Sequence, residues 1–307
     1  MELTVQEEKL LKRHREVQQH EEYQYLHLLE DIMENGIDSD DRTGVGTKSI
    51  FGTQMRFSLR DSFPLFTTRR IFFRGAVEEL LWMIRGDTDA KLLQEKNIHI
   101  WDGNTTKEFL AGRKLNYEEG QIGKLYGFQM RNWGGDWDKH MKGEKTGVDQ
   151  LDYIVSTLKK DKTSRRLVMS YWNASEIDEG VLTPCHAFVQ FRVNQKTNEL
   201  DCMMTQRSCD YCCGVVLNVP FYALMTQLIA KIVGLNPGEL LWSGGDSHIY
   251  KTHMENALIQ IEREPYPFPK VEIPDIQSIK DIEDLQFEDF KLIDYKFHPS
   301  LKYPMAV

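Results

Sequence analysis

Cys185 is the residue whose surroundings in the sequence best suit a nucleophile. It stands between Pro184 and His186 at the start of a predicted strand, where a side chain can be held rigidly and still face a cleft. A neighbouring cation would lower the thiol pKa from about 8.5 and supply the thiolate that attacks electrophilic carbon. Arg207, at the end of the next predicted strand, is the candidate cation. Most free cysteines are small buried hydrophobic residues, so a packing role stays open on this pattern alone.

Four arginines stand in loops or at the ends of predicted elements, where they could bind one phosphate group. Guanidinium groups contact phosphate oxygens in pairs, so such a cluster would hold a phosphate monoester specifically. Ordinary surface salt bridges are the alternative, because a sequence does not show whether the side chains converge. The four are Arg42 in a glycine-containing loop, Arg165 and Arg166 before a strand, and Arg207 beside Ser208.

Glu79, His248 and Tyr250 are polar residues within predicted regular structure. Glu79 lies off the apolar stripe of its helix, but its helical neighbours Trp82 and Met83 are apolar. Its carboxylate would then enter a partly dry space and its pKa would rise, unless it is a solvated surface residue. His248 and Tyr250 alternate as in a strand, so both should point to one face and could bind one sugar hydroxyl.

The cysteine run Cys209, Cys212 and Cys213 predicts packing and no metal centre. Zinc sites usually need a second ligand pair at a suitable spacing, and the adjacent Cys212 and Cys213 form no such knuckle. Five cysteines are an odd number, and no apolar secretory signal precedes them. We therefore expect a reducing, intracellular location, the cytoplasm.

Length and composition predict one soluble domain. With 307 residues, 41% of them hydrophobic and 28% charged, the chain can bury a core without disulfides or metals. Residues 1–20 are expected to form a charged, solvated arm, and residues 21–307 the catalytic domain. No apolar run approaches the roughly 20 residues of a membrane span. The net charge of -9 argues against a requirement for nucleic acid.

Hydrophobic periodicity predicts an α+β domain in which helices cover a sheet. The last expected helix is apolar on most of its circumference, so it should be buried against the sheet. The expected helices cover residues 25–35, 74–85 and 221–233, the expected strands cover 167–172, 186–193 and 200–206, and loops cover 41–47 and 134–148.

Short motifs along nearly the whole chain resemble the thymidylate synthase family. Their order and spacing also agree with that family, and only the first twenty or so residues fall outside the resemblance. It implies a single-domain fold with a large mixed β-sheet covered by helices, one sheet face lying at a symmetric dimer interface. The motifs are Asp41-Arg42-Thr43-Gly44, Glu79-Leu80-Leu81-Trp82, Ile100-Trp101-Asp102, Pro184-Cys185-His186, Gln206-Arg207-Ser208-Cys209-Asp210, Gly245-Asp246-Ser247-His248-Ile249-Tyr250 and the tail at 298–307.

The resemblance implies reductive methylation of dUMP to dTMP, with 5,10-methylenetetrahydrofolate as the donor of the one-carbon unit and the hydride, and dihydrofolate as the second product. Cys185 would add to C6 of the pyrimidine, so that C5 can attack the one-carbon unit. Glu79 would organise proton transfers at O4, and Tyr126 would help to remove the C5 proton. The implied catalytic set is Cys185, Glu79, Tyr126, His186, Arg207 and Asp210.

The same resemblance assigns residues that bind the two substrates. Asn218 would offer both a donor and an acceptor to the uracil edge, and so favour uracil over cytosine. Arg165 and Arg166 would reach the phosphate from the second subunit of a homodimer. The nucleotide set is Arg42, Arg165, Arg166, Arg207, Ser208, Asn218, His248 and Tyr250, and the folate set is Trp101, Asp210 and Ala306.

The chain departs from the family pattern just after Asp210. The family usually reads L-G-x-P-F-N there, whereas this chain reads C-G-V-V-L-N from Cys213 to Asn218. This change alters the pocket wall, so a related hydroxymethylase, in which water captures the methylene and 5-hydroxymethyl-dUMP results, is the alternative. Trp101 favours hydride transfer, because an indole over the intermediate helps to exclude water. An inactive nucleotide-binding or RNA-binding relative is a third reading, but it should have lost Cys185, Glu79 or the tail.

Overall fold

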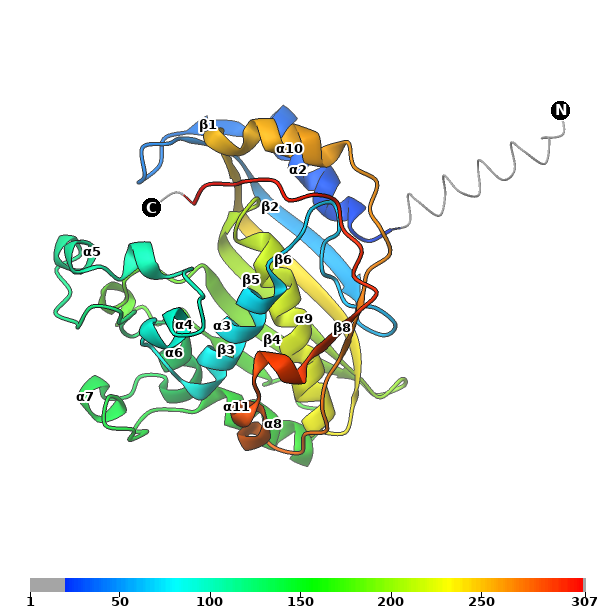
Figure 1. Ribbon diagram of the computed structural model, residues 1–307. Helices are drawn as coiled ribbons and strands as arrows, with labels where there is room; N and C mark the ends of the chain where they lie inside the picture. The colour runs from blue at the N-terminus through cyan, green and yellow to red at the C-terminus, as the bar shows by residue number, and fades with distance from the viewer. Residues whose placement is uncertain (1–19, 306–307) are drawn as a thin grey trace, which may run out of the picture.

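A six-stranded mixed sheet organises residues 20–305, the part of the chain that this computed structural model describes (Figure 1). Its strands lie in the order β1-β2-β6-β5-β4-β3, and neighbours are antiparallel except for β5 and β6, which are parallel. The predicted arm falls almost wholly outside the described residues. The six strands are β1 Ile37–Ser39, β2 Thr47–Ser58, β3 Val168–Ser170, β4 His186–Asn194, β5 Glu199–Asp210 and β6 Asn236–Tyr250.

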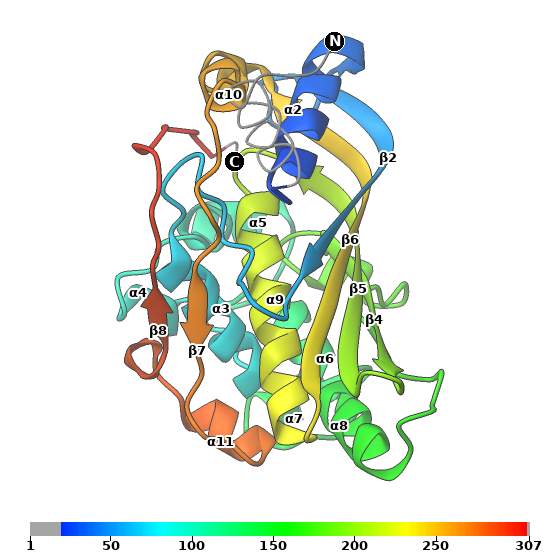
Figure 2. The same ribbon diagram turned by 90° about the vertical axis from the view of Figure 1, so that its right-hand side faces the viewer.

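Helices and a small two-stranded sheet complete the α+β architecture, which confirms the predicted fold class. Figure 2 shows α9 and α3 packed on one face of the large sheet, with β7 and β8 on the far side of these helices. The helices are α2 Tyr23–Asn35, α3 Phe73–Arg85, α4 Lys91–Gln94, α5 Lys107–Gly112, α6 Tyr126–Asn132, α7 Trp137–His140, α8 Gln150–Lys160, α9 Val215–Ile232, α10 Met254–Ile261 and α11 Ile279–Asp284, and the small sheet pairs β7 Lys270–Glu272 with β8 Lys291–Ile293.

Helix α9 forms the centre of the core and is longer than predicted. It begins at Val215, six residues before the expected start, because Pro220 lies inside the helix without ending it. A proline costs an interior helix one hydrogen bond, and burial of nearly every residue of α9 against the sheet and α3 offsets that cost. By length and composition α9 could cross a membrane, but most of it is buried inside this fold.

The predictions for α2 and α3 are confirmed to within two residues. Leu29 and Ile32 of α2 are buried, as its apolar stripe requires. Gly36 ends that helix, and its N–H donates to the Ile32 carbonyl. Its backbone is extended, with φ -65°, and does not adopt the left-handed conformation typical of a glycine at a helix end. Gly86 ends α3 with φ 82°, in the left-handed region.

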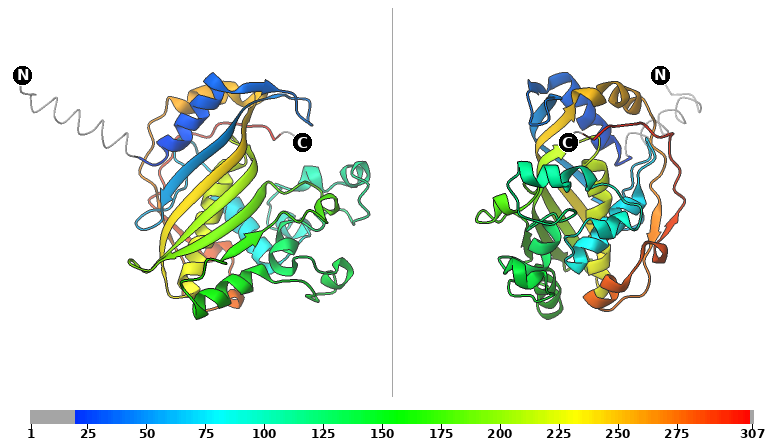
Figure 3. Two further views of the ribbon diagram at one scale, coloured as in Figure 1. Left: turned by 180° about the vertical axis from the view of Figure 1, so that it is seen from behind. Right: turned by 60° about the vertical axis from the view of Figure 1, so that its left-hand side comes forward.

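The sheet face opposite α9 is largely bare. In the left view of Figure 3 the long strands face the viewer, and no helix among residues 20–305 covers their middle. Along β2 the side chains alternate, with Met55 and Phe57 buried on the α9 side and Gln54 and Arg56 exposed on the other. Within the same strand Phe51, which pairs with Asp246 of β6, is 88% exposed.

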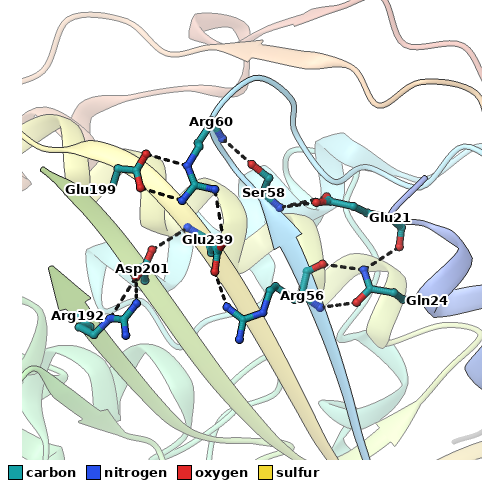
Figure 4. Close-up of polar contacts among 9 residues, drawn as sticks. All are labelled: Glu21, Gln24, Arg56, Ser58, Arg60, Arg192, Glu199, Asp201 and Glu239. Atoms are coloured by element: carbon teal, nitrogen blue, oxygen red, sulfur yellow. Dashed lines mark hydrogen bonds and ion pairs between the residues drawn. The ribbon is translucent and has the colours of Figure 1, made fainter. Parts of the chain in front are cut away.

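An ionic network crosses four strands at one end of this bare face (Figure 4). Arg60 contacts both carboxylate oxygens of Glu199 at 2.8 Å, and Arg192 contacts Asp201 at 2.6 Å. The N-terminal end of α2 joins the network, since Gln24 accepts from the Arg56 backbone N–H at 2.8 Å. Exposed ion pairs each contribute little stability, so we interpret the network as fixing strand register more than strengthening the fold.

Glu22, just before α2, is a fully buried carboxylate that anchors the chain at Thr67 and Thr68. Its oxygens accept from both backbone N–H groups at 2.8–3.0 Å, and from the Thr67 hydroxyl at 2.7 Å. We expect Glu22→Gln to lower the free energy of unfolding by about 2–4 kcal/mol, because an amide turns an N–H toward these donors and leaves them unpaired.

Urea denaturation followed by circular dichroism measures this effect. Glu30→Gln, at an exposed position on the same helix, is the matched control and should change stability by less than about 0.5 kcal/mol. Equal midpoints for the two variants would contradict the anchoring role of Glu22.

Candidate active site

Cys185 lies immediately before β4, where backbone and side-chain contacts from β5 fix it. The Arg207 N–H donates to the Cys185 carbonyl at 2.7 Å. The Arg207 guanidinium turns back over the same segment and donates to the carbonyls of Pro184 at 3.2 Å and Thr183 at 3.4 Å. Arg207 therefore stands beside Cys185, as predicted, and the thiol is partly exposed.

The electrostatic surroundings of Cys185 correct one prediction. Burial raises the thiol pKa above its ordinary value, and this effect outweighs the opposing influence of Arg207, of the Tyr126 hydroxyl and of Arg42. The expectation of a net lowered pKa is therefore wrong, because desolvation disfavours the thiolate more than the cations favour it. The cations still limit the rise, so they act in the predicted direction.

Glu79 and Tyr126 are linked to each other through Trp101. The Trp101 indole N–H donates to Glu79 at 2.9 Å, and the Trp101 ring lies 5.9 Å from that of Tyr126, edge to face. The Tyr126 hydroxyl in turn accepts from the Cys185 N–H at 3.0 Å. Burial raises the pKa of Glu79 to about 7, which confirms the predicted direction. Glu79 can therefore hold or release a proton near neutral pH.

His186 packs behind Cys185 as a neutral imidazole. Burial lowers its pKa to about 4. Its Nδ1 lies 3.0 Å from the Tyr222 hydroxyl of α9, and its ring lies 5.0 Å from that of Tyr126. The sequence analysis assigned no role to Tyr222. The signal available was a hydroxyl within an otherwise apolar helix, since a buried tyrosine hydroxyl usually has a polar partner.

Asn218 is oriented by a second residue that the prediction left without a role, Gln206. The Asn218 amide donates to Gln206 Oε1 at 3.0 Å, and the Trp242 indole donates to the same oxygen at 3.0 Å. With its NH2 group engaged in this way, Asn218 has a fixed amide orientation at the first turn of α9.

The polar ends of β5 and β6 lie side by side. Parallel pairing sets Ser208 beside Asp246 and Asp210 beside His248. The rings of His248 and Tyr250 lie 5.3 Å apart, which agrees with their predicted common face. Burial, assisted by Asp210 and Asp41, raises the pKa of Tyr250 to about 12.

The loop that carries Arg42 is held in place by Asp41. The Asp41 carboxylate accepts from Thr43 N–H at 2.8 Å and from Gly46 N–H at 2.7 Å, and Gly44 and Gly46 have φ of 73° and 80°. This shape brings the Arg42 charge close enough to influence both Cys185 and Tyr250. The predicted role of Arg42 at a phosphate stays a prediction.

Arg165, Arg166 and Ala306 are not brought to this site by the described chain. Both arginines are exposed between α8 and β3, at the far edge of the sheet. Ala306 lies outside the described residues. The tail before it is docked, since Tyr303 stacks under the Arg69 guanidinium at 4.3 Å and donates to Gln260 at 2.8 Å.

The cysteine run separates into two kinds of residue. Cys209 and Cys212 are fully buried free thiols, as the packing prediction holds. Cys213 is half-buried, and its sulfur lies with an oxygen of Asp210 and a nitrogen of His253 in a group whose atoms are all within 4.8 Å of one another. No local pattern predicted His253 at this place, because forty residues separate it from Cys213.

Comparisons with known proteins match the same motifs. The profile of the family described as Thymidylate synthase matches residues 23–307. The chain is 49% identical to the bifunctional dihydrofolate reductase-thymidylate synthase of Leishmania major, over 94% of this chain and 56% of that protein. It is 46% identical to the thymidylate synthase of Human herpesvirus 8, over 94% and 85%, and 45% identical to that of Homo sapiens, over 94% and 91%.

The chain spans little more than half the length of the bifunctional relatives, and most of the length of the single-function ones. The profile match covers every element of the described fold except the first residues before α2. Together, the profile and these identities show that the chain belongs to the thymidylate synthase family.

Proposed function

We propose that this protein is a methyltransferase that converts dUMP to dTMP, with 5,10-methylenetetrahydrofolate as co-substrate and dihydrofolate as the second product. One observation carries the proposal: Arg207 holds the segment from Thr183 to Cys185 through three hydrogen bonds, the Tyr126 hydroxyl accepts from the Cys185 N–H, and Cys185 itself is half-buried. Family membership supplies the reaction class. The activity assay that tests it identifies the nucleotide product by mass, as described below for the alternative.

Cys185 would begin the reaction by adding its sulfur to C6 of the uracil ring, which places negative charge on C5 and O4. Glu79, with a pKa of about 7, would exchange a proton with O4 through water as that charge forms and disappears. The folate supplies the one-carbon unit and the final hydride. Tyr126 would help to take the C5 proton, after which the C6–sulfur bond breaks and Cys185 is regenerated.

Substrate recognition is proposed to rest on the fixed polar groups around Cys185. Arg42, Arg207 and Ser208 would hold the phosphate, and His248 with Tyr250 would bind the 3'-hydroxyl of the deoxyribose. Trp101 and Asp210 would contact the folate, together with Ala306 of the tail. His186 would line the site as a neutral residue that positions Tyr222 and Tyr126.

Asn218 is the proposed source of the preference for uracil. We expect Asn218→Asp to shift the ratio of kcat/KM for dCMP over dUMP by at least about tenfold, because the carboxylate cannot donate and repels the uracil carbonyl. Assays with both nucleotides measure the ratio. Asn198→Asp, at an exposed turn between β4 and β5, is the control, and an unchanged preference in Asn218→Asp would count against the uracil contact.

A homodimer is proposed through the bare sheet face, with Arg165 and Arg166 completing the phosphate site of the second subunit. Neither arginine reaches the Cys185 site of its own chain, and both are exposed. A symmetric interface would place the same sheet face of two copies together.

Mixing two inactive variants tests this shared site. We expect Cys185→Ala and the double variant Arg165→Ala/Arg166→Ala to regain roughly a quarter of wild-type activity after refolding together, because half of the dimers then contain one intact site. Each variant refolded alone is the control. No recovery in a mixture that size measurements show to be dimeric would exclude a shared site.

A deoxyuridylate hydroxymethylase is the second candidate, favoured by the altered segment from Cys213 to Leu217. Water would capture the methylene, and the product would carry one more oxygen than dTMP. The hydrogen bond from Trp101 to Glu79 at 2.9 Å holds the indole over the Tyr126 side of the site, which favours exclusion of water and hydride transfer. Mass spectrometry of the nucleotide product separates the two.

A cytoplasmic location remains a prediction.

A further inference from the structure

Asp210, Cys213 and His253 gather three different metal-binding atoms beneath the C-terminal segment. A carboxylate oxygen, a sulfur and a ring nitrogen lie within 4.8 Å of one another, and Asp210 Oδ1 is 4.0 Å from His253 Nδ1. The three come from the end of β5, the turn after it, and the turn before α10. The proposed reaction uses Asp210 but neither Cys213 nor His253, so these two residues have no assigned task.

The orientation of His253 leaves one nitrogen with a free lone pair. Its Nε2 lies 2.7 Å from the Pro304 carbonyl, which can only accept, so Nε2 carries the hydrogen. In the neutral ring Nδ1 is then unprotonated. His253 is fully buried, and its Nδ1 has no hydrogen-bond partner among residues 20–305. Metal-binding histidines commonly donate one ring N–H to a carbonyl in this way, which fixes the ring and leaves the lone pair of the other nitrogen for the ion.

The other two ligands are also held in place. Asp210 Oδ1 accepts from the backbone N–H groups of Cys212 and Cys213, both at 3.0 Å, which fixes the carboxylate over the turn. The Cys213 sulfur lies 3.5 Å from the Tyr303 carbonyl, and its residue is partly exposed, so an ion can reach it from solvent. The side chain of Asp210 is 21% exposed on the same side.

We propose that Asp210, Cys213 and His253 bind one Zn²⁺ ion or a similar borderline divalent cation. Zinc bonds of about 2.0–2.3 Å in a tetrahedron place ligand atoms roughly 3.3–3.8 Å apart, so closure requires movements of about 1 Å or less. Sulfur and imidazole donors select zinc over magnesium or calcium. Binding exchanges the Cys213 S–H bond for a metal–sulfur bond and releases the proton to solvent, and a water molecule takes the fourth position.

The site joins the metal to the tail. His253 contacts the Pro304 carbonyl through Nε2, so an ion on Nδ1 would hold the tail through this residue, whereas the Cys213 thiolate would lose its hydrogen bond to the Tyr303 carbonyl. It would also occupy the Asp210 carboxylate, which the proposed function assigns to folate. That last consequence rests on the proposed function, whereas the ion site itself does not.

Titration with Co²⁺ tests the site, because cobalt bound to thiolate absorbs in the near ultraviolet and replaces zinc with the same geometry. The full chain carries Cys185→Ser, which removes the other accessible thiol, and nucleotide and folate are left out. We expect one Co²⁺ per chain with a thiolate band that one equivalent of Zn²⁺ abolishes. Cys213→Leu should lose the band, and His253→Gln should weaken binding at least about tenfold.

Two controls make the result decisive. Cys202→Ala removes a buried thiol outside the cluster and should leave the titration unchanged. Circular dichroism checks that each variant is folded. Leucine is the residue of the family pattern at position 213, so Cys213→Leu is expected to fold. An absent thiolate band in folded protein, or a band that survives in Cys213→Leu, would overturn the proposal, and neither result depends on whether the protein methylates dUMP.

Discussion

Replacing Cys185 with alanine is expected to lower turnover of dUMP by at least about 10⁴-fold while nucleotide binding is retained. The sulfur is the only part of the proposed reaction that forms a covalent bond between protein and nucleotide. The groups proposed to bind the nucleotide, Arg207, Arg42 and Asn218, keep their own supports from Thr183, Asp41 and Gln206 when the thiol is gone. Binding should therefore survive the loss of chemistry.

Two measurements check this expectation. Product formation is followed by mass spectrometry, and dUMP binding by calorimetry, with Cys202→Ala as a control that removes a buried thiol elsewhere on β5. Incubation with 5-fluoro-dUMP and methylenetetrahydrofolate should add the mass of both to the wild-type chain and not to Cys185→Ala. Formation of dTMP by the purified variant would refute the assigned role.

Replacing Glu79 with glutamine is expected to reduce kcat by about 10²–10³-fold and, at the same time, to stabilise the protein at alkaline pH. Activity falls because an amide cannot exchange the proton at O4. Either oxygen of the carboxylate can accept from the Trp101 indole N–H, whereas the amide can accept only through its single oxygen. The inflection near pH 7 that Glu79 gives to kcat/KM should disappear.

The stability gain follows from proton linkage. The pKa of Glu79 is about 7 in the fold, above its ordinary value of 4.5, so between these values the folded state binds more protons than the unfolded state. The contribution of Glu79 to the free energy of unfolding of the wild-type protein is therefore greatest below pH 4.5 and is lost as the pH rises through 7. Since Glu79 is partly exposed, we expect Glu79→Gln to gain about 1–3 kcal/mol at pH 8 and little at pH 5.

Thermal unfolding at the two pH values measures the gain. Glu95→Gln, at an exposed site nearby in the chain, should show the same unfolding temperature as wild type at both. A Glu79→Gln variant that is less stable than wild type at pH 8 would show that the ionised Glu79 carboxylate does not destabilise the folded state.

The sequence was informative where a local pattern sets the outcome. The apolar stripe of α3 located Glu79 among apolar neighbours, and its raised pKa follows from that placement. Strand alternation correctly set His248 and Tyr250 on one face. The order of predicted strands was enough to place Arg207 beside Cys185.

The features that the sequence did not predict depend on opposing contributions to a pKa or to helix stability, or on contacts between residues far apart in the chain. The direction of the Cys185 pKa depends on how far burial outweighs three favourable neighbours, and sequence does not measure burial. The expected start of α9 was six residues late, because a local pattern does not include the packing that lets Pro220 lie inside the helix. The partners Gln206 and Tyr222, and the approach of His253 to Cys213, exist only in the folded chain.

The parallel pairing of β5 with β6 also bears on how this protein is made. Strands that run in the same direction need a crossover, and here α9 is that crossover, so Ser208 and Asp210 meet Asp246 and His248 only after the helix has formed and folded back. Such non-local closure is slow relative to local helix formation. During synthesis, this half of the candidate site therefore cannot assemble until Tyr250 has left the ribosome.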